Sequence, residues 1–229
     1  RGEDVNYRGE SFEPIVAFGP AGALPHYSAT KESSQVVGKN SFLLMDTGAP
    51  YIFGTTDTTR TVPVGELSHA QRRHYTLVLK GMIRLSMACF PKNTRGSQLD
   101  ILARGPLFND GEMYFHGTGH GIGHYLCVHE GPQSIRMEEN PVTLEPGMVM
   151  SNEPAIYFSG RYGIRTENVI AVKEWKETEF NKFFEFETFT LVPIATSCLL
   201  PEMLSQSEME WLNALCSQTT AHSGHILYL

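Results

Sequence analysis

The sequence predicts a single domain that mixes helices and strands, and three observations support this. At 229 residues the chain is long enough for one core of the α/β or α+β class, which would bury roughly 70–75% of the surface of the unfolded chain. Several β-prone runs are bounded by glycine, proline and asparagine, which is typical of strands and turns. Other segments place apolar residues on one face at the 3.6-residue period of a helix.

The net charge argues against one class of partner. The chain carries 18 lysine and arginine residues against 25 aspartate and glutamate residues, a formal charge of −7 at pH 7. Phosphate binding needs a basic surface, so we expect no nucleic-acid partner. The sequence has no run of about 18 apolar residues, so we also expect no membrane span.

The start of the chain and its cysteines bear on the compartment. Residues 1–10 are polar and have no signal-peptide pattern, and we expect a disordered or truncated linker there, followed by one domain over residues 11–229. The four cysteines (Cys89, Cys127, Cys198 and Cys216) are widely spaced and form no CxxC pair. This pattern suits a reduced, cytoplasmic compartment without disulfides or a thiolate zinc site.

The first expected strand is Ser11–Gly19, and a turn at Pro20–Gly22 ends it. His26 follows Pro25, a context that favours extended backbone over helix. A lone histidine in such a place is more often a hydrogen-bonded structural residue than part of a site. His26 by itself therefore indicates no chemistry.

A hairpin is expected next, from two β-prone segments, Phe42–Met45 and Thr55–Val62, joined by turn residues within 48–54. The hairpin would bring the carboxylates of Asp46 and Asp57 together. A carboxylate directly after a buried strand is unfavourable without a partner, and two close carboxylates share a proton or hold cations. The alternative is that Asp46 caps a turn and Asp57 is a solvated strand residue.

Three helices are expected. The clearest is Ser68–Cys89, which opens with a Ser68–Gln71 capping box and carries an apolar stripe. A shorter helix begins at Ser97, with Leu99, Ile101, Leu102 and Leu107 on its apolar side. The last is Ser207–Cys216, where Ser207 and Glu210 form a second capping box.

A segment rich in glycine and histidine, His116–Pro132, lies in the middle of the chain. Glycine costs about 1 kcal/mol per position inside a helix, so we expect a loop whose backbone approaches another group closely. Its four histidines would reach one cavity. Neither the GxGxxG spacing of a nucleotide loop nor the HExxH spacing of a zincin fits. Neutral imidazoles acting as metal ligands or proton carriers remain.

Two later strands repeat the pattern of an acid closing an apolar run. Gly147–Asn152 is followed by Glu153, and Gly163–Val172 carries Arg165 and Glu167 on one face because side chains alternate along a strand. Four such acids beside a histidine-rich loop are hard to explain as four independent caps.

The acids Asp46, Asp57, Glu153 and Glu167 together with imidazoles suit Mn²⁺, Co²⁺ or Zn²⁺. Their combined negative charge exceeds that of one divalent ion, so two metals sharing bridging carboxylates balance it better. Metal pairs of this kind activate a water molecule and polarise an electrophile, which predicts metal-assisted hydrolysis. Histidines outside the metal shell would then hold a carbonyl or carry a proton.

Four segments in order carry a family resemblance: DTGAPYIFGTTDTTRT, HGTGHGIG…VHEGP, SNEPAIY and GIRTEN. They resemble the catalytic domain of the Xaa-Pro aminopeptidases, members of the pita-bread metallopeptidase family that includes prolidase and methionine aminopeptidase. The resemblance runs from about Ser11 to about Leu212. It implies an α+β fold: a curved antiparallel sheet with helices on its outer face and a dinuclear metal site on the concave side. It also implies hydrolysis of the bond between an amino-terminal residue and a following proline.

The resemblance implies five metal ligands: Asp46, Asp57, His120, Glu153 and Glu167. Asp57 and Glu167 would bridge two divalent ions. Asp46 would complete the shell of one ion, and His120 with Glu153 that of the other. Manganese is the expected metal, with zinc or cobalt as alternatives.

The resemblance also implies roles outside the metal shell. Glu153 would act as the general base, Arg165 would orient the carboxylates beside the substrate, and His124 would be structural. Three histidines would lie on the substrate side and hold the scissile carbonyl and the proline, namely His26, His116 and His129, of which His116 and His129 would also be catalytic.

Some features depart from the family pattern. Ala155 stands where glycine usually follows Glu-Pro, and we expect it to crowd the pocket. The tail after Cys216 does not resemble the family's ending. The amino-terminal domains of a full-length member are missing, so an isolated catalytic domain is expected, and the full-length protein could form a homodimer. A prolidase-type Xaa-Pro dipeptidase and a non-catalytic binding module are the alternative functions.

Overall fold

The computed structural model describes residues 4–125 and 127–223. The strands within them are β1 (Ile15–Phe18), β2 (Ser41–Tyr51), β3 (Gly54–Val64), β4 (Cys89–Pro91), β5 (Gly119–Ile122), β6 (His129–Ile135), β7 (Val149–Asn152), β8 (Ala155–Phe158), β9 (Tyr162–Arg165), β10 (Asn168–Glu177) and β11 (Lys182–Thr188). The helices are α1 (His69–Ser86), α2 (Gly96–Phe108) and α3 (Gln206–Ser223), with short 3₁₀ helices η1 (Gly19–Ala23) and η2 (Pro201–Met203).

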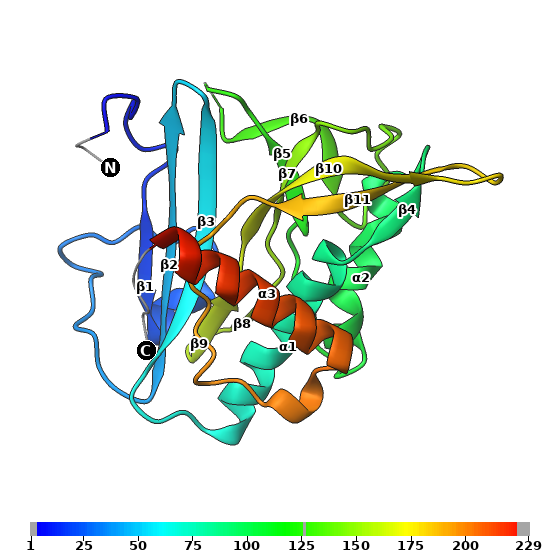
Figure 1. Ribbon diagram of the computed structural model, residues 1–229. Helices are drawn as coiled ribbons and strands as arrows, with labels where there is room; N and C mark the ends of the chain where they lie inside the picture. Colours follow the sequence, from blue (N-terminus) through cyan, green and yellow to red (C-terminus); the bar gives the residue numbers. More distant parts are fainter. Residues whose placement is uncertain (1–3, 126, 224–229) are drawn as a thin grey trace.

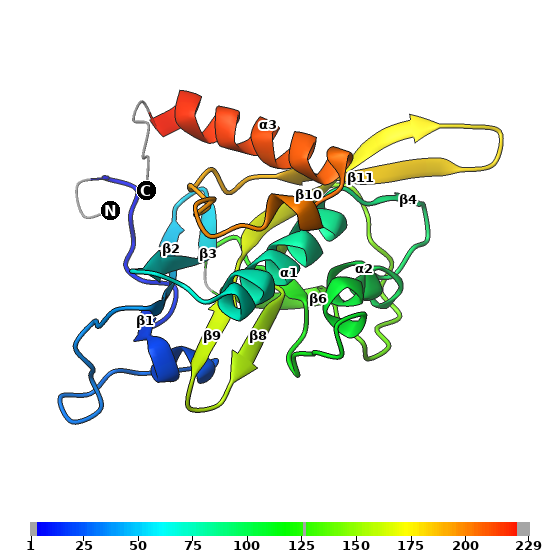
Figure 2. The same cartoon turned by 90° about the horizontal axis from the view of Figure 1, so that it is seen from below.

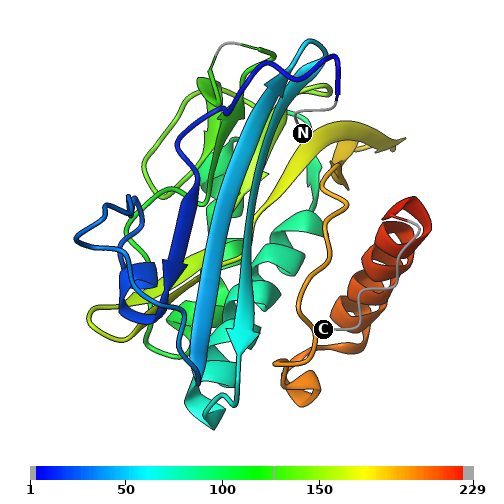
Figure 3. The same cartoon turned by 90° about the vertical axis from the view of Figure 1, so that its left-hand side faces the viewer.

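The strands form three antiparallel sheets, in the orders β1-β2-β3, β4-β11-β10-β7-β5-β6 and β8-β9. The long β2–β3 pair runs along one side of the molecule (Figure 1), and Figure 3 shows α3 on the side away from this pair. Helix α1 contacts α2, α3, β8 and β9, and it lies between α3 and the β8–β9 pair (Figure 2). The predicted α+β architecture, with helices on one face of antiparallel sheets, is confirmed.

The predicted hairpin forms, but its turn lies further along the chain than expected. Strand β2 continues through Gly48 and Pro50, and the chain reverses only at residues 52–53. Proline is tolerated at position 50 because its backbone nitrogen and carbonyl point away from β3. The carbonyl accepts from the Arg8 amide instead, so the missing Pro50 N–H costs no hydrogen bond to β3. A Cβ at Gly48 would collide with the Thr56 carbonyl oxygen. Gly48 therefore serves the close strand pairing rather than a turn.

The expected single strand over residues 163–172 is two strands, β9 and β10. The β7–β8 segment pairs with them as a second arm: Asn152 opposes Asn168, and Ala155 opposes Arg165. Between these pairs the ladder is interrupted, because the chain passes from the six-stranded sheet to the two-stranded one. Glu153 and Glu167 both lie in this interruption, so their side chains need not follow the alternation between the two faces of a sheet that holds within a strand.

The glycine–histidine segment is not the loop that the sequence predicts, since β5 and the start of β6 lie within it. Glycine is tolerated in these strands because neighbouring backbone approaches too closely for a side chain. A Cβ at Gly119 would meet the Ser151 carbonyl oxygen, and one at Gly121 would meet that of Glu130. The expectation of close backbone approach is thus correct, although the expectation of a loop is wrong.

The three expected helices are present with different details. The capping box of Ser68 and Gln71 is confirmed. Ile101 of α2 is 53% exposed and does not belong to its apolar side. Helix α3 is capped by Ser205 rather than Ser207, because the Ser205 amide donates to Glu208 and the Glu208 amide donates to Ser205.

The core lies between α1 and the sheets. Phe42 of β2 stacks on Tyr75 of α1 with ring centroids 5.9 Å apart, and Ile156 and Ile164 belong to the same buried cluster. Ahead of β1, Tyr7 forms a β-bridge with Tyr51 at the hairpin end. Helices in the described part of the chain lack the combination of length and hydropathy that a membrane span requires.

Candidate active site

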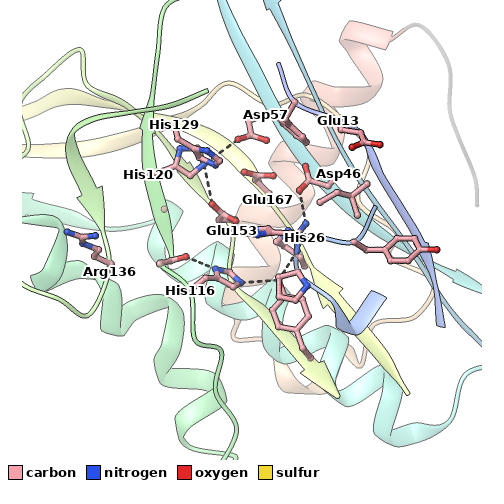
Figure 4. Close-up of a pocket in the computed structure, with 18 of the residues that line it drawn as sticks. Glu13, His26, Asp46, Asp57, His116, His120, His129, Arg136, Glu153 and Glu167 are labelled. Atoms are coloured by element: carbon pink, nitrogen blue, oxygen red, sulfur yellow. Dashed lines mark hydrogen bonds and ion pairs between the residues drawn. The ribbon is translucent and has the colours of Figure 1, made fainter. Parts of the chain in front are cut away.

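A cavity of about 600 Å³ opens on the concave side, between the β2–β3 hairpin and the β5–β6 strands (Figure 4). Its lining includes every residue for which the sequence predicts a site role: His26, Asp46, Asp57, His116, His120, His129, Glu153, Arg165 and Glu167. These residues span more than half of the chain. The fold therefore brings the predicted set together completely.

Asp57, His120 and Glu167 form the tightest group, with one potential ligand atom from each lying within 4.8 Å of the others. His120 Nε2 is 3.3 Å from Asp57 Oδ2 and 3.4 Å from Glu153 Oε1. The β2–β3 register explains the place of Asp57, which opposes Gly48 and so lies diagonally across the ladder from Asp46. The acids thus face one point from three different parts of the backbone.

The orientation of His120 suits a metal ligand. Its Nδ1 lies 2.9 Å from the carbonyl oxygen of Gly121. A carbonyl oxygen can only accept, so Nδ1 carries the hydrogen and Nε2 faces Asp57 and Glu153. Fixing one ring nitrogen by a backbone carbonyl is how proteins orient a metal-binding imidazole.

Asp46 is half satisfied. Arg165 Nη2 donates to Asp46 Oδ2 at 2.6 Å, and both side chains are largely buried. The other oxygen, Asp46 Oδ1, is buried and has no hydrogen-bond partner among the described residues. A buried polar atom without a partner is unfavourable by about 1–3 kcal/mol, so this oxygen has the environment of a ligand atom awaiting a cation.

Burial raises the pKa values of the clustered acids. The pKa of Glu153 is raised to about 7, chiefly by burial, with the Asp57 and Asp46 charges adding to it. Burial and the neighbouring carboxylates also raise the pKa of Glu167 and, partly offset by its hydrogen bond with His120, that of Asp57. These shifts show carboxylates held together against their repulsion, which divalent cations would relieve. The donor set therefore fits the divalent metals expected from the sequence.

Thr59 links the arginine to the far acid. It lies two residues after Asp57 on β3, and its hydroxyl donates to Glu167 Oε2 at 2.8 Å while accepting from Arg165 Nε at 3.1 Å. The predicted role of Arg165 in orienting the carboxylates is consistent with these contacts. Thr59 itself was not predicted, because a threonine in a strand carries no distinguishing signal.

Arg60 holds the same region from the opposite face of β3. Its guanidinium donates to the carbonyl oxygens of Thr59 (2.9 Å), Glu167 (2.5 Å), Val192 (2.9 Å) and Pro193 (3.1 Å) and to Asn168 Oδ1 (2.8 Å). Burial lowers its pKa to about 10. This buried cation ties β3, the start of β10 and the chain after β11 together beneath the acids.

His116 connects to Arg165 through Tyr157, another residue that the sequence did not identify. His116 Nδ1 lies 2.8 Å from the Gly117 carbonyl oxygen, and burial lowers the His116 pKa to about 4. The neutral ring therefore carries its hydrogen on Nδ1, and Nε2 accepts from the Tyr157 hydroxyl at 3.0 Å. Tyr157 in turn accepts from Arg165 Nη1 at 2.7 Å.

A buried ion pair in α2 supports the backbone of His116. Arg104 pairs with Asp100 at 2.6 Å and donates to the carbonyl oxygens of Tyr114 and His116, each at 2.7 Å. The sequence held a signal for this pair, because an aspartate and an arginine four residues apart meet on one helix face.

The remaining histidines differ in their surroundings. His129 packs edge-on against His120 with ring centroids 4.2 Å apart, and partial burial and the His120 charge lower its pKa. His26 is exposed and reaches the cavity from the segment after η1. His124 is exposed and lies outside this cavity. Ala155 does not crowd the pocket as expected, because it is fully buried in the core beneath α1.

Comparisons with known proteins agree on one family. Residues 1–174 match the metallopeptidase family M24, and residues 182–227 match the C-terminal region of peptidase M24. The second match corrects the expectation that the tail after Cys216 departs from the family. The chain is 47% identical over 219 residues to a probable Xaa-Pro aminopeptidase P of Tuber melanosporum, covering 93% of this chain and 35% of that protein. A probable Xaa-Pro aminopeptidase P of Paracoccidioides brasiliensis is 43% identical, covering 95% and 36%.

Solved structures give the same result. X-prolyl aminopeptidase from Caenorhabditis elegans, described as a cytosolic enzyme with a di-nuclear active site, matches with a TM-score of 0.93 and 39% identity over 98% of this chain and 37% of its own. Prolidase from Pyrococcus furiosus matches with a TM-score of 0.67 and 30% identity, covering 80% and 50%. The chain spans about 35% of the length of the curated relatives it matches.

Proposed function

Because the chain belongs to metallopeptidase family M24, we propose that it is the catalytic part of an Xaa-Pro aminopeptidase. It would hydrolyse the peptide bond between an amino-terminal residue and a following proline. The observation that carries this proposal is the convergence of four carboxylates and His120 in one cavity, where Asp46 Oδ1 has no hydrogen-bond partner within residues 4–125 and 127–223. A cytoplasmic location and a homodimer of the longer protein belong to the same proposal.

Two divalent ions, with manganese as the first choice, would be held by the proposed ligands Asp46, Asp57, His120, Glu153 and Glu167. Bound there, such ions supply Lewis acidity and a water molecule of lowered pKa. Asp57, Glu167 and His120 lie close enough together to be ligands of one shared ion, which supports this ligand set.

The chain's own groups would manage the proton and the substrate. Glu153 would act as the general base, because its carboxylate lines the cavity and lies 3.4 Å from His120 Nε2, at the centre of the proposed ligand set. His26, His116 and His129 would hold the scissile carbonyl and the proline, and His116 and His129 would also be catalytic. Arg165 would keep Asp46 oriented through its ion pair.

The first experiment is cleavage of Ala-Pro-Ala by metal-stripped protein with and without Mn²⁺, with Ala-Ala-Ala as the control peptide. We expect Mn²⁺-dependent release of alanine from the proline peptide alone. Glu167→Gln should abolish metal binding, measured by calorimetry, and activity together, whereas Glu187→Gln on the exposed face of β11 should change neither. Metal uptake and full activity in Glu167→Gln would refute the assignment, and cleavage of Ala-Pro but not Ala-Pro-Ala would make the protein a prolidase.

A further inference from the structure

Ser151 is a fully buried residue of β7 that contacts two of the proposed metal ligands. Its hydroxyl oxygen lies 3.0 Å from the backbone nitrogen of His120 and 3.1 Å from Oε1 of Glu153. Ser151 does not belong to the lining of the cavity. Any part that it takes in the reaction therefore passes through these two neighbours.

The direction of the Ser151 hydroxyl hydrogen follows from its two partners. An amide N–H can only donate, so Ser151 Oγ accepts from His120 and its single hydrogen is left for the carboxylate. Ser151 Oγ therefore donates to Glu153 Oε1. Water cannot replace this donor, because Ser151 has no exposed surface.

Glu153 depends on this contact because no strand pairing holds it. It lies in the interruption between β7 and β8, where its amide donates to the Thr118 carbonyl oxygen at 2.8 Å. That bond fixes the backbone of Glu153 but leaves its side chain able to rotate. The bond from Ser151 holds Oε1 on the side of His120, where it lies 3.4 Å from Nε2.

The second contact of Ser151 holds the backbone of His120. Strands β5 and β7 pack closely here, since a Cβ at Gly119 would collide with the Ser151 carbonyl oxygen. The next amide along β5, that of His120, donates to the Ser151 hydroxyl. One hydroxyl thus joins the backbone that carries His120 to the carboxylate of Glu153, and these are the two residues that would complete the shell of the same ion.

We propose that Ser151 is a positioning residue, which holds Glu153 and His120 in place for one of the two divalent ions. This inference rests on the proposed aminopeptidase function and adds the residue that orients its general base. Hydrogen-bond partners that orient metal ligands typically contribute about 10- to 100-fold to metal affinity. Loss of the Ser151 hydroxyl should therefore weaken the ion held by His120 and Glu153 more than the ion completed by Asp46.

The test is calorimetric titration of metal-free protein with Mn²⁺. Wild type should bind two ions, and Ser151→Ala should weaken the binding of one of them by about tenfold or more. Ser151→Thr keeps the hydroxyl and should restore the affinity. Thr76→Val is the matched control and should keep both affinities. Thr76 is also fully buried, its hydroxyl also accepts from an amide at 3.0 Å (that of Leu200), and it lies outside the cavity lining.

Kinetics and stability separate positioning from a general loss of structure. At saturating Mn²⁺, Ser151→Ala should lower kcat for Ala-Pro-Ala by about tenfold and change KM little, because the hydroxyl contacts the general base and not the substrate. Urea unfolding of metal-free Ser151→Ala and Thr76→Val should show similar losses of stability. A loss of metal affinity in Ser151→Ala alone then does not come from a weaker fold.

Three results would overturn the assignment: unchanged affinity for both ions in Ser151→Ala, equal weakening in Ser151→Ala and Thr76→Val, or no recovery in Ser151→Thr. Failure of wild type to cleave Ala-Pro-Ala while it binds two ions would instead refute the aminopeptidase function. The calorimetric comparison of the variants would then decide the role of Ser151 by itself.

Discussion

Arg165 and Asp46 form an ion pair in which only one carboxylate oxygen is used. Arg165 Nη2 donates to Oδ2 at 2.6 Å, while Oδ1 is buried without a partner among the described residues. The arginine thus fixes the direction of Asp46 and leaves the second oxygen available. This division supports an oriented ligand more than a structural salt bridge, in which both oxygens would be satisfied.

Replacing Arg165 with Gln should destabilise the metal-free protein by about 3 kcal/mol, because Asp46 becomes an uncompensated buried charge. Urea unfolding measures this change. Metal affinity should also fall, since Asp46 loses the donor that orients it and Thr59, which donates to Glu167, loses its contact with the guanidinium. Arg8→Gln, at an exposed arginine in the segment before β1, is the control. Unaltered stability and metal affinity would contradict the orienting role.

Tyr157→Phe should lower kcat/KM by about tenfold while leaving metal binding intact. The hydroxyl joins His116 Nε2 to Arg165 Nη1, and hydrogen bonds to charged groups contribute about 1.5–3 kcal/mol. Phenylalanine keeps the ring, so the packing should survive. Steady-state kinetics and metal titration together check this, and a parallel loss of metal affinity would show that Tyr157 acts on the metal ligands instead.

Arg60→Met should destabilise the fold by about 3–5 kcal/mol, because several buried carbonyl groups lose their donor. Arg60→Lys should be milder, since an ammonium can serve some of these acceptors. Chemical denaturation of both variants in the absence of metal measures the difference. Equal stability of the Arg60→Met and Arg60→Lys variants would show that the five hydrogen bonds of Arg60 do not stabilise the packing of β3 on the segment around Glu167.

The attachment of α3 should weaken in acid. Burial alone would raise the pKa of Glu208, but hydrogen bonds from Lys80, the Ser205 amide and Arg84 lower it to about 2. The unfolded chain then binds the proton more readily, so this stabilisation is complete above the ordinary pKa of 4.5 and is lost as pH falls toward 2.

Thermal unfolding between pH 6 and pH 3 checks this expectation for Glu208. The Glu208→Gln variant should have a lower melting temperature than wild type at pH 6, and the difference should shrink as the pH falls. Glu202→Gln, in the nearby exposed 3₁₀ helix η2, is the matched control. A constant difference between Glu208→Gln and wild type across this range would contradict the role of the Glu208 charge.

Asp46, Glu153 and Glu167 could be singled out from the sequence because each closes or interrupts an apolar run, whereas Asp57 lies among threonines and was joined to them by the predicted hairpin. The histidines of the cavity were assigned through the family resemblance. The backbone geometry that brings these acids together could not be predicted from the sequence. Strand alternation places Arg165 and Glu167 on one face, but the structure brings them together through Thr59, across a break between two sheets. Such a break depends on the pairing of distant strands, which local patterns do not encode.

The cap of α3 shows the same limit at a smaller scale. Ser205 with Glu208 and Ser207 with Glu210 both match the capping-box pattern. Lys80 and Arg84 of α1 decide between them, because they hold Glu208 where it can also accept from Ser205. Tertiary ion pairs thus choose between two local signals of equal quality. The supporting pair Asp100–Arg104 could have been predicted from its helical spacing alone.

The five proposed metal ligands come from β2, β3, β5 and the two arms of an interrupted ladder, which together belong to separate sheets. Metal bound by all of them would join segments that are distant along the chain, so it would stabilise the folded state in proportion to the logarithm of its free concentration. A cell short of metal would then lose more than catalysis. The protein itself would unfold more often, and degradation would lower its abundance.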